Sequence, residues 1–159
     1  MGKVYMPEKA LWTEADFDIM GWHDCPVHAF SFDNANHMLL DIDYIFKWVL
    51  RKNKRYYDFW IAPCTLVFEH VHSIALESDY LPIEIMDISK TVLPTSEKLS
   101  GVQSDVFYDW LIETTTGELS FKSTGFKQYV RQAPIFVNTQ KIDMEVRGGI
   151  SFSLDTMKI

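Results

Sequence analysis

The feature that most constrains the fold is a strict alternation of side chains from His37 to Leu50. Large apolar residues occupy every second position, and the positions between them include Asp41, Asp43 and Lys47. A period of two places neighbouring side chains on opposite faces of an extended chain, so the pattern predicts a β-strand with one apolar face. The apolar face consists of Met38, Leu40, Ile42, Tyr44, Phe46 and Trp48.

The segments around this strand also alternate. Residues 22–33 alternate up to a turn at 33–36, where Asp and Asn bond their own backbone, so residues 22–50 are predicted to form a hairpin. The apolar segment 57–76 contains Pro63, which cannot donate to a ladder and predicts an edge or a bulge. Its alternation slips between Phe68 and Val71, which also indicates a bulge.

The rest of the chain adds shorter elements. A second hairpin is predicted over residues 106–123, with Gly117 in its turn. Further strands are expected at 83–88, 126–137 and 149–154, and the most polar stretch, 89–105, is predicted to be a loop. Residues 13–21 indicate a short helix of about two turns, with Thr13 as its N-cap.

About seven strands without βαβ alternation predict one all-β domain over residues 1–159. We expect an antiparallel β-sandwich or a strongly curved meander sheet with one short N-terminal helix. Aromatic residues make up 14% of the chain, enough to dominate such a core. The net charge of −7 argues against binding to nucleic acid, because it repels phosphates, and favours a basic protein partner.

Other composition signals concern compartment and redox chemistry. The first residues lack the apolar core of a signal peptide, and no segment approaches the roughly 18 apolar residues of a membrane helix. A cytoplasmic location without membrane contact is therefore expected. Cys25 and Cys64 lie in apolar runs and are predicted to be buried free thiols.

Several strings resemble a group of uncharacterised small bacterial β-proteins. They are residues 21–25 (GWHDC), 40–44 (LDIDY), 59–63 (FWIAP) with 65–69 (TLVFE), and 124–129 (TGFKQY). Similar β-meander proteins occur among the immunity proteins of polymorphic toxin systems. The resemblance spreads over roughly residues 15–135 and consists of strand patterns. It implies an all-β fold and, as a hypothesis, immunity function, and it supplies no catalytic residues.

One set of candidate residues points to metal chemistry. His70 and His72 are two positions apart, which on a strand would turn both imidazoles to one side. His28 and the pair Asp41 and Asp43 could complete an open site for zinc or iron. A metal-dependent enzyme with a His/Asp site on the sheet is therefore an alternative function. A solvated strand face, which also carries Lys47, is the stronger explanation of Asp41 and Asp43.

The leading hypothesis is a non-enzymatic cytoplasmic binding protein, and an immunity-type inhibitor of a bacterial toxin is its most specific form. Its motivation is an acidic, aromatic-rich domain without a catalytic motif. The basic loop 51–55 could bind a phosphate or an acidic partner, and the aromatic stripe could line the cavity of a small-ligand carrier. The predicted binding surface comprises Trp22, Asp24, Asp41, Asp43, Lys127, Tyr129 and Arg131.

Overall fold

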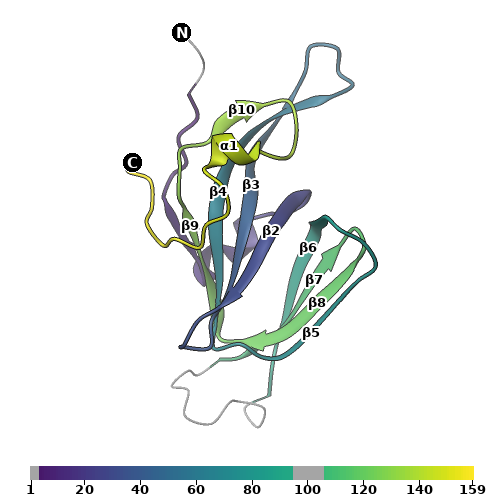
Figure 1. The fold of residues 1–159 in the computed structure, drawn as a ribbon, viewed down its shortest axis with the longest axis vertical. Helices are drawn as coiled ribbons and strands as arrows, with labels where there is room; N and C mark the ends of the chain where they lie inside the picture. The colour runs from purple at the N-terminus through teal and green to yellow at the C-terminus, as the bar shows by residue number, and fades with distance from the viewer. Residues whose placement is uncertain (1–3, 95–105) are drawn as a thin grey trace.

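A computed structural model describes residues 4–94 and 106–159, and its strands form one open antiparallel sheet (Figure 1). The described strands are β1 (Leu11–Thr13), β2 (Cys25–Phe32), β3 (Met38–Leu50), β4 (Tyr57–Glu69), β5 (His72–Ser78), β6 (Ile83–Val92), β7 (Tyr108–Thr114), β8 (Gly117–Ser123), β9 (Gly125–Val130) and β10 (Ile135–Val137). Their order across the sheet is β1-β9-β4-β3-β2-β6-β7-β8-β5, and β10 pairs separately with β4. The prediction of a mostly antiparallel all-β chain is confirmed.

The sheet bends back on itself, so that β6, β7, β8 and β5 lie opposite β2, β3, β4 and β9 (Figure 1). Two chain segments make this corner, one from β4 into β5 and one from β8 into β9. His70 adopts a left-handed backbone (φ 53°) between β4 and β5, and Thr124 N–H donates to Glu69 O across the corner (3.0 Å). The slip in alternation after Phe68 is therefore this corner and not a bulge within one strand.

The core fills the space inside the bend and is rich in aromatic side chains. Phe68 packs against Phe121 and Trp110, with ring centroids 4.6 and 5.1 Å apart, and both contacts are close to edge-to-face. Edge-to-face contacts of this kind add to the free energy gained from area burial. Cys25 and Cys64 are buried free thiols, as predicted, and burial raises the pKa of Cys25 to about 12.

Both predicted hairpins form. β2 and β3 pair from Val27–Ile42 to Phe32–Met38, and β7 and β8 pair with Gly117 at the start of β8. The predicted polar loop 89–105 is wrong at its start, because residues up to Val92 belong to β6, where Ser89 pairs with Leu111. The rest of that prediction, residues 95–105, lies outside the described residues.

The helices differ from the prediction. The N-terminal segment forms a 3-10 helix, η1 (Glu14–Ile19), and the only described α-helix is α1 (Met144–Arg147), near the other end of the sequence. Asp16 accepts the N–H of Thr13 (2.9 Å), and Met20 N–H bonds back to Phe17 O (3.2 Å). Such tight i→i−3 bonds are usual for short helical pieces.

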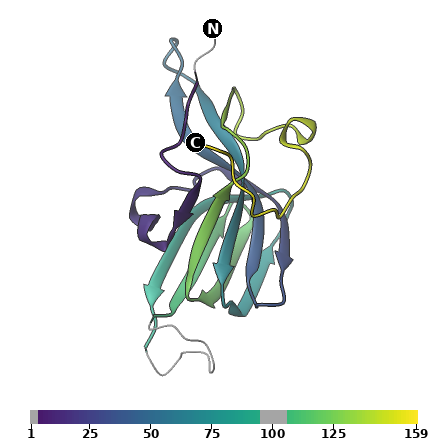
Figure 2. The same ribbon diagram turned by 90° about the vertical axis from the view of Figure 1, so that its left-hand side faces the viewer.

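The predicted last strand, 149–154, does not form. This C-terminal segment instead runs across the outer face of β3 and β4 (Figure 2). Its backbone is held by side chains: Ser151 N–H donates to Asp41 (3.0 Å), and Ser153 O accepts from Thr65 (2.8 Å). Because side chains satisfy these groups, the segment does not need a ladder of strand hydrogen bonds.

A local irregularity in β3 changes which side chains share a face. The register of β3 shifts against β4 between Ile45 and Lys47, so that Trp48 lies on the side of Asp43 and not on that of Tyr44. The single apolar face predicted up to Trp48 is therefore wrong beyond this bulge.

Pro63, which predicted an edge or a bulge, lies in the interior of β4. It stands between the positions that pair with β9 and those that pair with β10, where no ladder donor is needed.

Candidate functional site

Asp41 and Asp43 lie side by side on the outer face of β3, and both are fully buried. Arg147 of α1 bridges them: its guanidinium donates to both oxygens of Asp41 (2.6 and 2.8 Å) and its Nε donates to Asp43 (3.0 Å). Arg131 adds a third hydrogen bond to Asp41, at 2.8 Å. The sequence pattern predicts a binding surface or a solvated strand face for the two aspartates, and both predictions are wrong because the two side chains are buried.

His28 completes this buried network. The register of β2 against β3 shifts between Val27 and Ala29, which places His28 at a bulge. Its Nε2 lies 2.8 Å from Asp43 Oδ2, and the Ile142 N–H donates to the same oxygen (2.9 Å). The network therefore ties β2, β3 and the C-terminal segment together.

The charges of this network stabilise one another. Burial alone would raise the pKa of Asp41, but hydrogen bonds from Arg147, Arg131 and the Ser151 N–H outweigh burial, so the pKa lies below its ordinary value of 3.8. Burial lowers the pKa of Arg147, and its bonds to both aspartates more than reverse that effect. Two carboxylates thus balance two guanidiniums, and their role is to anchor the C-terminal segment.

The remaining predicted surface residues occupy different places. Trp22 is buried, with its indole N–H bonded to Gln128 in the core (2.8 Å). Lys127 and Tyr129 lie on β9, which is covered at its edge by β1, and Lys127 forms a loose ion pair with Glu69 (3.7 Å). The structure therefore does not gather the predicted residues into one surface, and Asp24 borders the pocket described below.

The three predicted metal ligands are also apart. His28 bonds Asp43, His70 bonds the Thr124 hydroxyl (2.9 Å), and His72 bonds Ser73 (3.2 Å). The left-handed backbone at His70 breaks the strand periodicity that would have aligned it with His72. Across residues 4–94 and 106–159, no three His, Cys, Asp or Glu side chains are grouped so that they could hold a metal ion.

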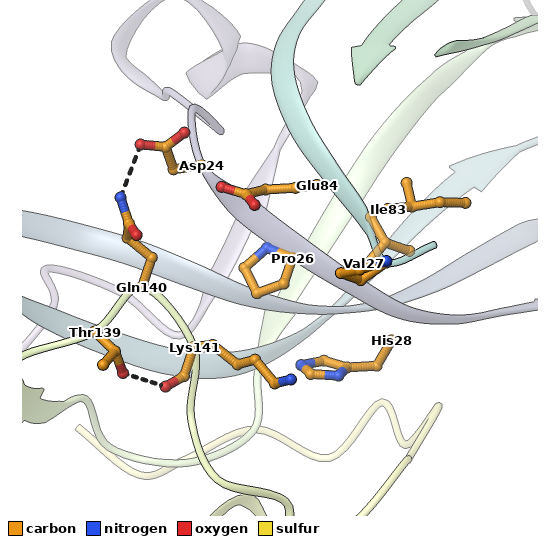
Figure 3. Close-up of a pocket in the computed structure, with 10 residues that line it drawn as sticks. Asp24, Pro26, Val27, His28, Ile83, Glu84, Thr139, Gln140 and Lys141 are labelled. Carbon is orange, nitrogen blue, oxygen red and sulfur yellow. Dashed lines mark hydrogen bonds between the residues drawn. The ribbon is translucent and has the colours of Figure 1, made fainter. Parts of the chain in front are cut away.

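A pocket of about 200 Å³ lies where β2 and β6 begin, beside residues 139–141 (Figure 3). Its apolar wall consists of Pro26, Val27, Pro82 and Ile83. Figure 3 shows Asp24 and Glu84 on the opposite side of Pro26 from Lys141 and His28. Cys25 pairs with Ile85 and Pro26 with Glu84, so the short β2–β6 ladder brings the two carboxyl groups together.

The two carboxyl groups of this pocket are in unfavourable contact. The pKa of Glu84 is raised, first by burial and then by the charge and hydrogen bonding of Asp24. Asp24 accepts a hydrogen bond from Gln140 (3.0 Å) and lies 3.7 Å from the ring of His23. Within the described part of the chain, neither carboxyl forms an ion pair with a lysine or arginine. Figure 3 shows the Lys141 amino group beside His28 instead.

Sequence reasoning identified Asp24 but not Glu84, Gln140 or Lys141. Glu84 lies in a predicted strand at 83–88, where alternation correctly separates it from Ile83 and Ile85. Nothing in the local pattern reveals that this strand pairs with β2, 60 positions earlier. The position of residues 139–141 beside this pocket depends on the buried network around Asp43. The hydrogen bonds of that network join residues about a hundred positions apart in the sequence.

Comparisons with protein families, with curated proteins and with solved structures find no match. None of the described helices has both the length and the apolar character needed to cross a membrane. The function must therefore be inferred from the pocket and its surroundings.

Proposed function

We propose that this protein is a binding protein whose partner is a basic protein, and that the Asp24–Glu84 pocket receives a lysine or arginine side chain of that partner. The observation that supports the proposal is the close pair of carboxyl groups, which has no lysine or arginine counter-charge among the described residues. A cation between the two groups would offset their mutual repulsion and favour the charged form of Glu84.

The shape and composition of the pocket suit a long cationic side chain. Such side chains place their aliphatic stem against apolar surface and keep the charged end beside polar groups. Here Pro26, Val27 and Ile83 would contact the stem, and Asp24 and Glu84 would contact the head. A volume of about 200 Å³ is below the roughly 300–1,000 Å³ of pockets that enclose whole organic ligands.

The net charge of −7 supports the same choice of partner, because it attracts a basic protein over a distance and raises the association rate. The strand-pattern resemblance makes an immunity-type inhibitor the specific form of this proposal. In that form the protein acts in the bacterial cytoplasm, carries out no reaction itself and blocks a toxin with a basic surface.

The proposal is tested with a defined probe. Acetyl-arginine amide, titrated into labelled protein, should shift the NMR signals of Asp24, Glu84 and Gln140. Glu84→Gln should weaken this binding at least fivefold. Asp109→Asn is the matched control, because Asp109 is exposed on β7 and its substitution makes the same change in net charge. Equal weakening by both variants, or no shift in the wild type, would overturn the proposal.

Glu84→Gln also has an expected effect on stability that separates a binding role from a structural one. A raised pKa means that ionised Glu84 costs stability, and the cost appears as the pH rises through that pKa from the ordinary value of 4.5. Removing the charge should therefore raise the melting temperature slightly at pH 7 while binding is lost. A variant that loses both stability and binding would show that Glu84 serves the fold.

A further inference from the structure

The hairpin of β3 and β4 extends beyond the rest of the molecule (Figure 1). Four of the five residues from Arg51 to Arg55 are basic, in a chain with only 15 lysines and arginines. Arg51 donates to Asp58 (2.8 Å), whereas Lys52, Lys54 and Arg55 form no ion pair with any described acidic residue. The local charge of this tip is therefore opposite to that of the whole protein.

The bulge after Ile45 places Trp48 on the outer face of this hairpin. Trp48 pairs with Phe59, and Leu50 pairs with Tyr57, so their side chains share one face with Ile45 and Ile61. The C-terminal segment covers this face near Ile45, where Ile142 is buried. Beyond that point Trp48 is 37% exposed and Tyr57 is 42% exposed.

A second pocket, of about 280 Å³, opens on this outer face. Its lining combines four aromatic rings with two arginines and two amides and contains no carboxylate. Asp58 holds the Nε of Arg51, and the guanidinium lies over the ring of Tyr56 at 5.9 Å, which fixes the orientation of this arginine. The lining residues are Trp48, Tyr56, Tyr57, Phe59, Arg51, Arg55, Asn138 and Gln140.

We propose that this pocket binds a small organic anion in which a planar ring is joined to a phosphate, the class that includes nucleoside monophosphates. The planar fork of an arginine can donate two parallel hydrogen bonds to two phosphate oxygens, which gives both strength and orientation. Aromatic side chains bind a planar ring by stacking or by edge-to-face contact. Asn138 and Gln140 supply donors and acceptors for the polar edge of such a ring.

Size and charge limit the ligand to a small one. The pocket volume is just below the roughly 300 Å³ at which pockets that enclose whole organic ligands begin, which excludes a dinucleotide. A nucleic-acid polymer would extend over the acidic body of the protein, where its phosphates are repelled. The site shares only Gln140 with the Asp24–Glu84 pocket and does not depend on the function proposed for it.

Calorimetric titration with AMP, adenosine and inorganic phosphate tests the proposal on the intact chain. AMP should bind at least tenfold more tightly than adenosine and than inorganic phosphate, because only AMP contacts both the arginines and the aromatic rings. Binding of AMP should also change the tryptophan fluorescence, and this change should disappear in Trp48→Phe. If inorganic phosphate or adenosine binds as tightly as AMP, or if AMP does not bind, the proposal is wrong.

A pair of variants in the same loop separates a built site from general attraction to the basic tip. Arg55→Gln should weaken AMP binding at least tenfold, because Arg55 lines the pocket. Lys52→Gln removes the same charge from the same loop but from a residue that does not line the pocket, and it should change affinity less than twofold. Equal losses in the two variants would overturn the proposal, provided circular dichroism shows both to be folded.

Discussion

At the scale of single residues, the balance of charge around Asp41 is the feature most open to test. Its carboxylate accepts bonds from Arg147, Arg131 and the Ser151 N–H in a place with no access to solvent. Asp41→Asn preserves the shape of the side chain but leaves two guanidiniums facing a single carboxylate, Asp43. Loss of one partner from a buried ion pair costs about 3–5 kcal/mol of unfolding free energy. We expect a loss of this size in urea denaturation.

The same variant should change how stability depends on pH. Because the pKa of Asp41 is lowered in the folded state, its contribution is complete above the ordinary value of 3.8 and is lost as pH falls through the lowered pKa. The wild type should therefore lose stability more steeply than Asp41→Asn below about pH 4. The exposed variant Asp109→Asn should remain within about 0.5 kcal/mol of wild type at pH 7. Equal stability of Asp41→Asn and Asp109→Asn would contradict the charge balance described for the network.

The burial of Asp41 and Asp43 could be predicted from the sequence only in part. The alternation of β3 correctly separates Asp41 and Asp43 from the apolar face. It cannot show that the other face is covered, because the cover comes from Arg147, 106 positions away, at a position for which the sequence pattern predicts no element. A buried aspartate and an exposed one have the same local sequence signal, and only the distant partner decides between them.

At the scale of elements, the close approach of β5 to β8 sets a strict limit at Gly117. This residue pairs with Ser78, and a Cβ added to it would lie 1.9 Å from the backbone oxygen of Glu77. Gly117→Ala must therefore push β5 away from β8. Overpacking of this kind costs about 1–3 kcal/mol. We expect that loss in unfolding free energy, together with faster hydrogen exchange of β5 amides, because β5 is an edge strand whose only neighbour among the described strands is β8.

Gly21→Ala is the control for this prediction. An added Cβ at Gly21 meets no atom within 4 Å. Replacing a glycine in such a place reduces the entropy of the unfolded chain and changes stability by less than about 1 kcal/mol. If Gly117→Ala proves as stable as Gly21→Ala, the β5–β8 contact is looser than the structure indicates.

Hairpins could be predicted from the sequence because their signals are local: alternating strands flank the turn residues at 33–36 and around Gly117. The bulge after Ile45 could not be predicted, because Phe46 continues the apolar alternation, and only pairing with β4 shows the shift. The corner at His70 left a visible break in the pattern, but the break alone does not distinguish a bulge from a change of direction. Local patterns thus reveal strands more reliably than their faces.

At the scale of the whole molecule, the fold class was predictable and the strand order was not. Period-two patterning along most of the chain leaves little choice except a β-sheet. The order depends on contacts such as β2 with β6, which rests on three residue pairs, and β1 with β9, which joins residues more than a hundred positions apart. The Asp24–Glu84 pocket exists only because of the first of these contacts, so it could not be found from local sequence.

Continuity through the bend predicts that the molecule unfolds as one unit. β4 continues into β5 and β8 into β9, and Phe68, Trp110 and Phe126 pack together from both sides of the bend. Neither side can open without exposing this shared core. Calorimetric and van't Hoff enthalpies of unfolding should therefore agree, and the transitions followed by circular dichroism and by tryptophan fluorescence should coincide.

Hydrogen exchange extends this test to individual strands. Leu66 in β4 and Ile112 in β7 lie on opposite sides of the bend and are buried, so we expect their amides to be among the most protected. Both should exchange with the free energy of global unfolding, whereas amides of the edge strand β5 should exchange through smaller openings. If β6, β7 and β8 open at a free energy well below that of β4, the two sides are separate cooperative units and the shared aromatic core does not couple them.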